Sequence, residues 1–268
     1  MNYFDRTGRR IPTDEMRVFG LNPRNYYRFQ QPVSDLKVIL ERSKKQGIVS
    51  NDFTLNEFKA AVNNITDKIN QNKLFKNILN GICIPFVCQR AHVGVDLGAE
   101  LVDNLLPKLK NAFAAQFPDA EFKAVLQNDS KLHGNVKLHP DARYEEFIDA
   151  VEERATVGLY FPQVLQEFDV NSQRLQMRSL PRIEGIKMCL SGGLDMCAAL
   201  VGSTEILFSE DFYTPIPIMS AYVHHDSRMI LMVKAYGPHL EFWCMSQMMT
   251  KKITQVSEQW TGGLTIYS

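Results

Sequence analysis

Between residues 34 and 117, apolar side chains recur every three or four positions, which is the spacing of amphipathic helices. The clearest stripe consists of Leu55, Phe58, Val62, Ile65 and Ile69. Thr54 and Glu57 stand at its start and form the Thr-x-x-Glu pattern of a capping box, in which each side chain binds the backbone N–H of the other residue. The pattern therefore predicts a helix that begins directly after Thr54.

Two further helices are predicted from their boundary residues. Ser34 is a suitable N-cap for a helix that continues to Gln46 and stops at Gly47. Asp96 caps a second apolar segment, which Pro107 either kinks or divides. We therefore expect residues 34–120 to form a helical subdomain.

After residue 120 the pattern changes to short apolar runs, which are typical of strands. Residues 122–126 and 136–138 flank a Gly-Asn turn and predict a hairpin. Three runs near the C-terminus, 216–224, 229–236 and 239–245, are separated by short breaks and predict an antiparallel meander. The middle run begins with a continuous apolar stretch, so we expect both of its faces to be covered.

A helix over residues 141–155 and a strand over 156–161 complete the region 121–268, which we expect to be a mixed α/β subdomain. The whole chain therefore predicts an α+β fold, with a helical N-terminal half and a C-terminal half built on an antiparallel or mixed β-sheet. At 268 residues the chain is long enough to bury a substantial core.

Residues 1–33 differ from the rest in composition. They include six arginines, no lysine, several aromatic residues and three prolines, and no helical or strand period persists. We expect an extended arm that packs on its own domain, on a neighbouring subunit or on nucleic acid, because Arg and aromatic side chains are enriched at protein interfaces and aromatic rings stack on bases. The candidate contact residues of this arm are Arg6, Arg9, Arg10, Arg24, Tyr26, Tyr27, Arg28 and Phe29.

One short segment carries a pattern associated with nucleotide binding. In Ile186–Asp195 an apolar run meets Ser-Gly-Gly-Leu-Asp, and a stretch able to form a helix follows. The two glycines let the backbone approach a ligand closely, and N–H groups at a helix start attract anions such as phosphate. This order resembles the pyrophosphate-binding loop of the PP-loop ATP pyrophosphatases, Ser-Gly-Gly-x-Asp-Ser, although Met196 replaces the final Ser.

The resemblance implies a nucleotide-binding enzyme in which Ser191, Gly192, Gly193 and Asp195 contact the phosphates. The alternative is a Gly-Gly turn between two core segments. We favour the turn, because in that family the motif opens a mostly parallel sheet, whereas an antiparallel meander is predicted after it here.

The overall composition argues against binding through a chain-wide electrostatic field. Apolar residues make up 45% and charged residues 22% of the chain, and thirty basic residues balance thirty acidic ones. Electrostatic binding of nucleic acid or of a charged partner would therefore need a local patch.

The five cysteines form no repeating framework, and we expect reduced, mostly buried thiols. Cys83, Cys88 and His92 lie close together in the sequence, but structural zinc prefers tighter Cys pairs and a fourth ligand, so neither a metal nor a cofactor is predicted. The chain shows no signal peptide at its start and no apolar run long enough to span a bilayer. We expect a cytoplasmic or intracellular protein that does not insert into a membrane, and a virion or a large complex is one location that this allows.

Together these observations predict a non-catalytic structural or adaptor subunit of a larger protein assembly, a class that includes viral and phage structural proteins and accessory components of bacterial machines. The arm and the apolar meander both suggest contacts with protein subunits, either copies of this chain or other proteins, and no familiar catalytic motif was found. Two alternatives remain open: a nucleotide-binding enzyme that uses Ser191–Asp195, and a nucleic-acid-binding protein that uses the arm.

Overall fold

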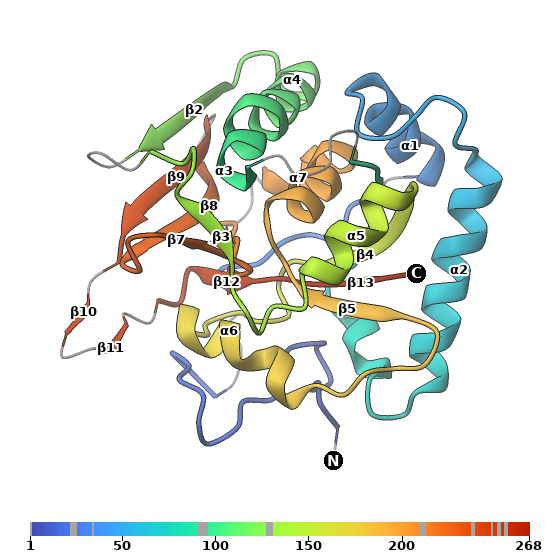
Figure 1. The fold of residues 1–268 in the computed structure, drawn as a ribbon. Helices are drawn as coiled ribbons and strands as arrows, with labels where there is room; N and C mark the ends of the chain where they lie inside the picture. The colour runs from blue at the N-terminus through green and yellow to red at the C-terminus, as the bar shows by residue number, and fades with distance from the viewer. Residues whose placement is uncertain are drawn as a thin grey trace.

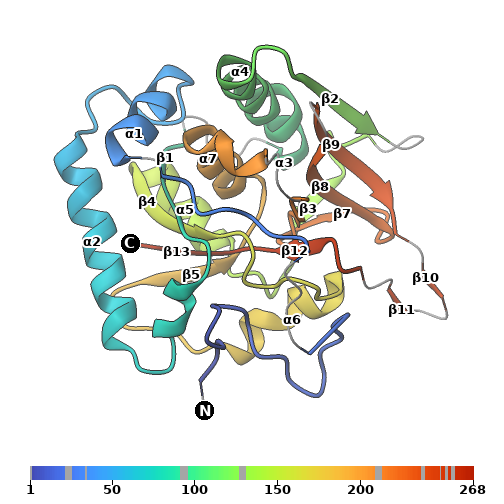
Figure 2. The same ribbon diagram turned by 180° about the vertical axis from the view of Figure 1, so that it is seen from behind.

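The computed structural model of the protein has an α+β fold, as the sequence predicted. The structure describes residues 2–21, 26–33, 35–90, 96–126, 131–208, 213–236, 239–247, 249–250, 253–254 and 257–268. Two main β-sheets lie side by side, with helices packed around them (Figure 1). The view from behind shows the same division, with the first sheet beside α2 and the second beside α4 (Figure 2).

The elements follow one another along the chain as helices, strands and short connections. The α-helices are α1 (Leu36–Lys45), α2 (Leu55–Gln71), α3 (Leu97–Ala99), α4 (Leu106–Gln116), α5 (Glu145–Glu153), α6 (Val170–Ser179) and α7 (Gly193–Gly202). The described residues also form two 3₁₀ helices, η1 (Lys76–Asn80) and η3 (Thr204–Leu207), and one π-helix, η2 (Glu100–Leu105). The strands are β1 (Ile84–Cys88), β2 (Glu121–Leu126), β3 (Val136–Leu138), β4 (Thr156–Phe161), β5 (Lys187–Leu190), β6 (Ile216–Ile218), β7 (Tyr222–His224), β8 (Met229–Tyr236), β9 (His239–Ser246), β10 (Met249–Thr250), β11 (Ile253–Thr254), β12 (Trp260–Gly262) and β13 (Leu264–Tyr267).

The first sheet has the strand order β1–β4–β13–β5, and each neighbouring pair is antiparallel. Gly158 on β4 pairs with Phe86 on one side and with Tyr267 on the other. A Cβ atom at Gly158 would lie 2.5 Å from the Phe86 ring, so the glycine provides the space that this buried ring fills. Strands that are far apart in the sequence thus meet in one sheet.

The second sheet has the order β12–β6–β8–β9–β2 and is mixed. β12 lies parallel to β6, and β2 lies parallel to β9, whereas β6, β8 and β9 are antiparallel neighbours. β12 and β13 are separated only by Gly263, so one C-terminal segment passes from the second sheet into the interior of the first. This segment joins the two sheets.

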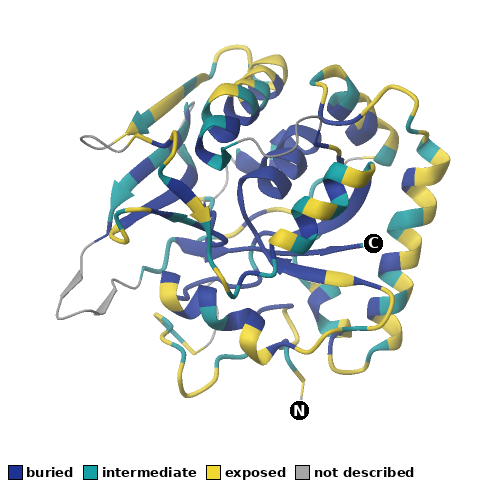
Figure 3. Ribbon diagram, viewed as in Figure 1, coloured by how far each residue is buried: buried dark blue, intermediate teal, exposed yellow. Residues whose placement is uncertain are grey.

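Helices α5 and α7 cover one face of the first sheet. Phe147 on α5 contacts Phe86 and Tyr267, and Asp195 on α7 binds Thr265 of β13. Every residue of α7 is buried, whereas α2 and α5 each expose one side to solvent (Figure 3). α7 is therefore an internal helix, and it contacts α1, α4 and β1.

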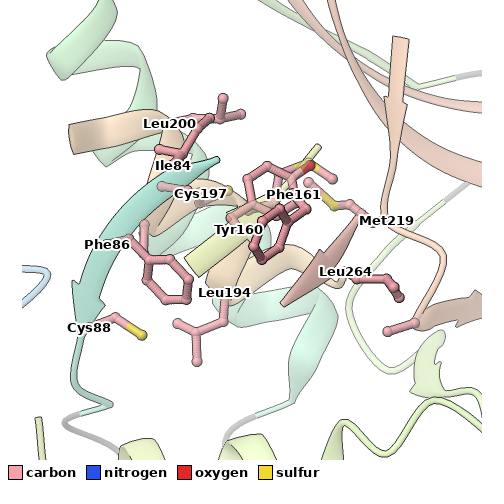
Figure 4. Packing of buried hydrophobic residues seen from close by; sticks show 14 of the residues in the cluster. Ile84, Phe86, Cys88, Tyr160, Phe161, Leu194, Cys197, Leu200, Met219 and Leu264 are labelled. Carbon is pink, nitrogen blue, oxygen red and sulfur yellow. The ribbon is translucent and has the colours of Figure 1, made fainter. Parts of the chain in front are cut away.

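One large hydrophobic cluster forms most of the core. Figure 4 shows part of it, where Phe86, Tyr160 and Leu194 come from β1, β4 and α7. Its members also include Phe4 of the arm and Phe242 of β9, so the cluster draws on all three regions that the sequence suggested as separate units. A smaller cluster around Ile218, Met232 and Trp260 covers the other face of the second sheet.

Several local predictions are confirmed. α2 begins at Leu55 with both hydrogen bonds of the Thr54–Glu57 capping box. Asp96 accepts a hydrogen bond from the Ala99 N–H, and Pro107 stands in the first turn of α4 where the π-helix ends. Strand 156–161 has the predicted bounds, and α5 is shorter than predicted.

Other predictions are wrong. The 122–126 and 136–138 segments do not form a hairpin, because β2 pairs with β9 and β3 pairs with β7. Asp35 caps α1 by accepting a hydrogen bond from the Lys37 N–H, and Ser34, the predicted cap, lies outside the described residues. In the meander, β6, β8 and β9 pair as expected, but the first run is divided and its second part, β7, leaves the sheet to pair with β3.

Candidate functional site

The Ser-Gly-Gly-Leu-Asp segment forms the junction between β5 and α7. β5 ends at Leu190 and α7 begins at Gly193, so strand, turn and helix occur in the predicted order. Ser191, Gly192, Gly193 and Asp195 are brought together at this turn, and all four are buried. The turn therefore faces the interior of the protein.

The Asp195 carboxylate is held by three hydrogen bonds from within the chain. Its Oδ1 atom accepts from the Tyr144 hydroxyl at 2.7 Å and from the Gly192 N–H at 2.8 Å. Its Oδ2 atom accepts from the Thr265 hydroxyl at 2.5 Å. Burial raises the pKa of Asp195, and these three hydrogen bonds act in the opposite direction. The carboxylate thus joins the start of α7 to α5 and to β13.

Two tyrosine rings occupy the space over the turn. A Cβ atom at Gly192 would lie 2.7 Å from both Tyr144 and Tyr222, and one at Gly193 would lie 2.7 Å from Tyr222. In addition, the Tyr144 hydroxyl accepts hydrogen bonds from the N–H groups of Leu194 and Asp195 at 3.1 and 3.3 Å. In a phosphate-binding loop such helix-start N–H groups face the anion. Here they face a tyrosine, and the geometry favours the core turn over the nucleotide-binding loop.

Arg9 fastens the N-terminal arm to its own domain. Its guanidinium donates to the carbonyl oxygens of Gln166, Leu21 and Gly20 at 3.0, 2.9 and 2.9 Å. It also forms an ion pair with Glu167 at 3.7 Å, and both side chains are buried. Burial lowers the pKa of Arg9, and the Glu167 carboxylate opposes this shift.

Further contacts attach the arm to the domain at several points. Arg10 donates to the carbonyl oxygens of Tyr3 and Ile11, at 3.0 and 2.6 Å. Phe4 is fully buried against Phe75. Phe29 is also buried, and its N–H donates to the Gln163 side chain at 3.1 Å. Arg9, Arg10 and Phe29 therefore attach the arm to the domain, and the arm runs beneath α6 (Figures 1 and 2).

Three tyrosines form an aromatic cluster on the surface. The ring centroids of Tyr26 and Tyr27 are 4.9 Å apart, and those of Tyr26 and Tyr213 are 5.5 Å apart. Tyr26 and Tyr213 remain 58% and 60% exposed. Phe19 and Leu21, which flank Gly20, are exposed as well, although the Leu21 carbonyl oxygen accepts from Arg9. The arm thus has an inner side that attaches to the domain and an outer aromatic side.

Three candidate arm residues remain, of which two lie on the surface and one lies outside the described residues. Arg6 and Arg28 are exposed, and the Arg28 N–H donates to the Tyr213 carbonyl oxygen. Arg24 lies outside the described residues. Tyr213 could not be predicted as a member of this cluster, because it lies far from the arm in the chain and no local pattern indicates its proximity to Tyr26.

The cysteines are free thiols, as expected. Cys88, Cys189, Cys197 and Cys244 are buried, and burial raises the pKa of the half-buried Cys83 to about 12. His92 lies outside the described residues. Within the described part of the chain, no group of three or more His, Cys, Asp and Glu side chains is arranged to hold a metal ion.

Comparisons with protein-family models, with curated proteins and with solved structures found no match to this chain.

Among the helices that the structure describes, none is long and apolar enough to cross a membrane.

Proposed function

We propose that this protein is a non-catalytic structural subunit that assembles with other protein subunits, foremost with copies of itself. The surface cluster of Tyr26, Tyr27 and Tyr213, in which Tyr26 and Tyr213 are exposed, is the observation that supports the proposal most directly. Tyrosine is enriched among the residues that dominate binding energy at protein interfaces. It offers a large apolar ring and a polar hydroxyl, and little conformational entropy is lost when it becomes ordered.

The attachment of the arm supports the same proposal. The carbonyl oxygen of Gln166 accepts a hydrogen bond from the Arg9 guanidinium. The side-chain amide of Gln166 donates to the Tyr27 carbonyl oxygen at 2.7 Å. The aromatic cluster is therefore held in place before a partner arrives, and such preorganisation reduces the entropy cost of binding.

The charge of the chain also favours self-association. Thirty basic and thirty acidic residues cancel, so copies of the chain do not repel one another through a net charge. A net charge near zero promotes association.

Sedimentation equilibrium over a range of protein concentrations tests the proposal. We expect reversible association at micromolar concentration, and we expect Tyr26→Ser combined with Tyr213→Ser to weaken it at least tenfold. Point variants are preferable to removal of the arm, because removal would also withdraw Phe4 and Phe29 from the core. The control is Leu126→Ser, which changes an exposed apolar residue on the second sheet.

Two results would contradict the proposal. If the chain remains monomeric at about 200 µM, the assembly proposal fails. Equal association of the double variant and the native chain would show that the tyrosine cluster is not the contact surface.

A further inference from the structure

A cleft with a volume of about 550 Å³ opens where the C-terminal half of α5 meets the ends of β5 and β13. This volume lies within the usual range for small-molecule sites, roughly 300–1,000 Å³. Its lining comes from α5 and the residues that flank it, from the segment 182–186 before β5, and from β5 and β13. It is separate from the tyrosine cluster, and the inference drawn from it does not depend on the proposed assembly.

Basic side chains dominate the polar part of the cleft. Arg143, Arg154, Arg182 and Lys187 line it, against the acidic Asp149 and Glu153. Arg182 pairs with the neighbouring Glu146 through two hydrogen bonds, at 2.5 and 2.9 Å. The same glutamate also lies near Lys187 and Arg143, and together these cations lower its pKa, chiefly through the hydrogen bonds from Arg182. Arg182 is thus paired with Glu146, whereas Lys187 and Arg143 act on this carboxylate only through their charge.

Arg143 is fixed in position by the end of α6. Its Nη2 atom donates to the carbonyl oxygens of Met177 and Leu180 at 2.5 and 2.6 Å. These carbonyls are at the helix C-terminus, where a cation is favourable. By contrast, Arg154 and Lys187 are exposed, and neither forms an ion pair with another residue in the described part of the chain. One cation is therefore preorganised and two are available to a ligand.

The remaining wall is apolar. Ile186, Met188 and Ile266 are buried, and Tyr267 packs beside them from β13. Apolar surface next to a few convergent charges is the usual construction of a site for a small organic molecule. Arginine in particular matches the two oxygens of a carboxylate or phosphate group.

We propose that this cleft binds a small organic anion, in which a carboxylate or phosphate group is attached to an apolar body. The anionic group lies at Arg154 and Lys187, near Arg143, and the apolar body lies against Ile186, Met188 and Ile266. The chemistry common to both ligand types is a delocalised anion next to an apolar or aromatic group.

Isothermal titration calorimetry of the full chain tests this site with phenyl phosphate, benzoate and benzyl alcohol as probes. We expect one equivalent of phenyl phosphate or benzoate to bind at least tenfold more tightly than the neutral benzyl alcohol. The tighter of the two anions identifies whether a phosphate ester or a carboxylate is preferred.

A combined Arg154→Gln and Lys187→Gln variant locates the binding. Both residues are exposed, so the variant should fold, and its melting temperature verifies this. We expect the affinity for the preferred anion to fall at least tenfold. The matched control, Arg228→Gln, removes an exposed arginine that pairs with Asp226 outside the cleft, and it should bind as the native chain does. The proposal is overturned if neither anion binds more tightly than benzyl alcohol, or if the double variant retains native affinity.

Discussion

Replacing Tyr144 and Tyr267 separately by phenylalanine isolates the contribution of the hydrogen-bond network around Asp195 to stability. Each change removes one hydroxyl oxygen from a tyrosine that is 1% exposed. Both rings contact Phe147, with centroid separations of 5.3 and 5.0 Å. The hydroxyl groups differ, because that of Tyr144 makes three hydrogen bonds, whereas that of Tyr267 has no partner among the described residues. The two variants therefore remove the same group, once from a hydrogen-bonded site and once from a site without a hydrogen-bond partner.

The Tyr144→Phe change should lower the free energy of unfolding by about 3–5 kcal/mol. A hydrogen bond to a charged group contributes about 1.5–3 kcal/mol, and leaving a buried donor without a partner costs about 1–3 kcal/mol. Tyr144→Phe removes the bond to the Asp195 carboxylate and also the acceptor of two N–H groups in the first turn of α7. The Asp195 carboxylate keeps its bonds from Gly192 and Thr265, which limits the loss.

Tyr267→Phe should leave the free energy of unfolding unchanged or raise it by about 1 kcal/mol. A buried hydroxyl without a partner costs about 1–3 kcal/mol on mutational scales, and the substitution removes that cost together with little packing. Urea unfolding at pH 7, followed by circular dichroism and tryptophan fluorescence, measures both variants. A loss below about 1 kcal/mol for Tyr144→Phe, or above about 1 kcal/mol for Tyr267→Phe, would refute the reasoning.

Three further predictions concern the core, the thiols and the pH dependence. Leu231→Ala should lower the free energy of unfolding by about 2–5 kcal/mol, because Leu231 is buried on β8, and a loss under about 1 kcal/mol would contradict that placement. The four buried cysteines should react with a thiol reagent only after unfolding, and rapid labelling of the native chain would contradict their burial. Because the pKa of Asp195 is raised, the folded chain binds its proton more tightly than the unfolded chain, so stability should fall as pH rises from about 4 through that raised pKa. Asp195→Asn should remove this part of the pH dependence in unfolding titrations. Identical pH profiles for the variant and the native chain would contradict the raised pKa of Asp195.

Much of the local structure could be predicted from neighbouring residues alone. The α2 helix follows from a stripe at helical spacing and from the Thr54–Glu57 pair, and all these interactions lie within a few positions of one another. The strand, turn and helix around Gly192 followed in the same way from an apolar run and two glycines. The run beginning at Met229 also indicated a strand covered on both faces.

The role of the Ser-Gly-Gly-Leu-Asp turn could not be predicted from that segment. The sequence shows two glycines and an aspartate, which are compatible with either a phosphate-binding loop or a tight internal turn. The choice depends on Tyr144 and Tyr222, which fill the space that the glycines leave, and on Thr265, which binds the carboxylate. These residues come from three other parts of the chain.

Strand pairing and the position of the arm were likewise decided by the tertiary structure. A strand pattern identifies which side chains are buried but not which strand lies beside it, so β2 and β3 were paired wrongly with each other. Helical periodicity and capping depend on residues within one or two turns, and the sequence therefore contains the information directly. Sheet order, the attachment of Arg9 to Gln166 and the meeting of Tyr26 with Tyr213 depend on contacts between distant segments, whose energies are set only when the whole chain packs.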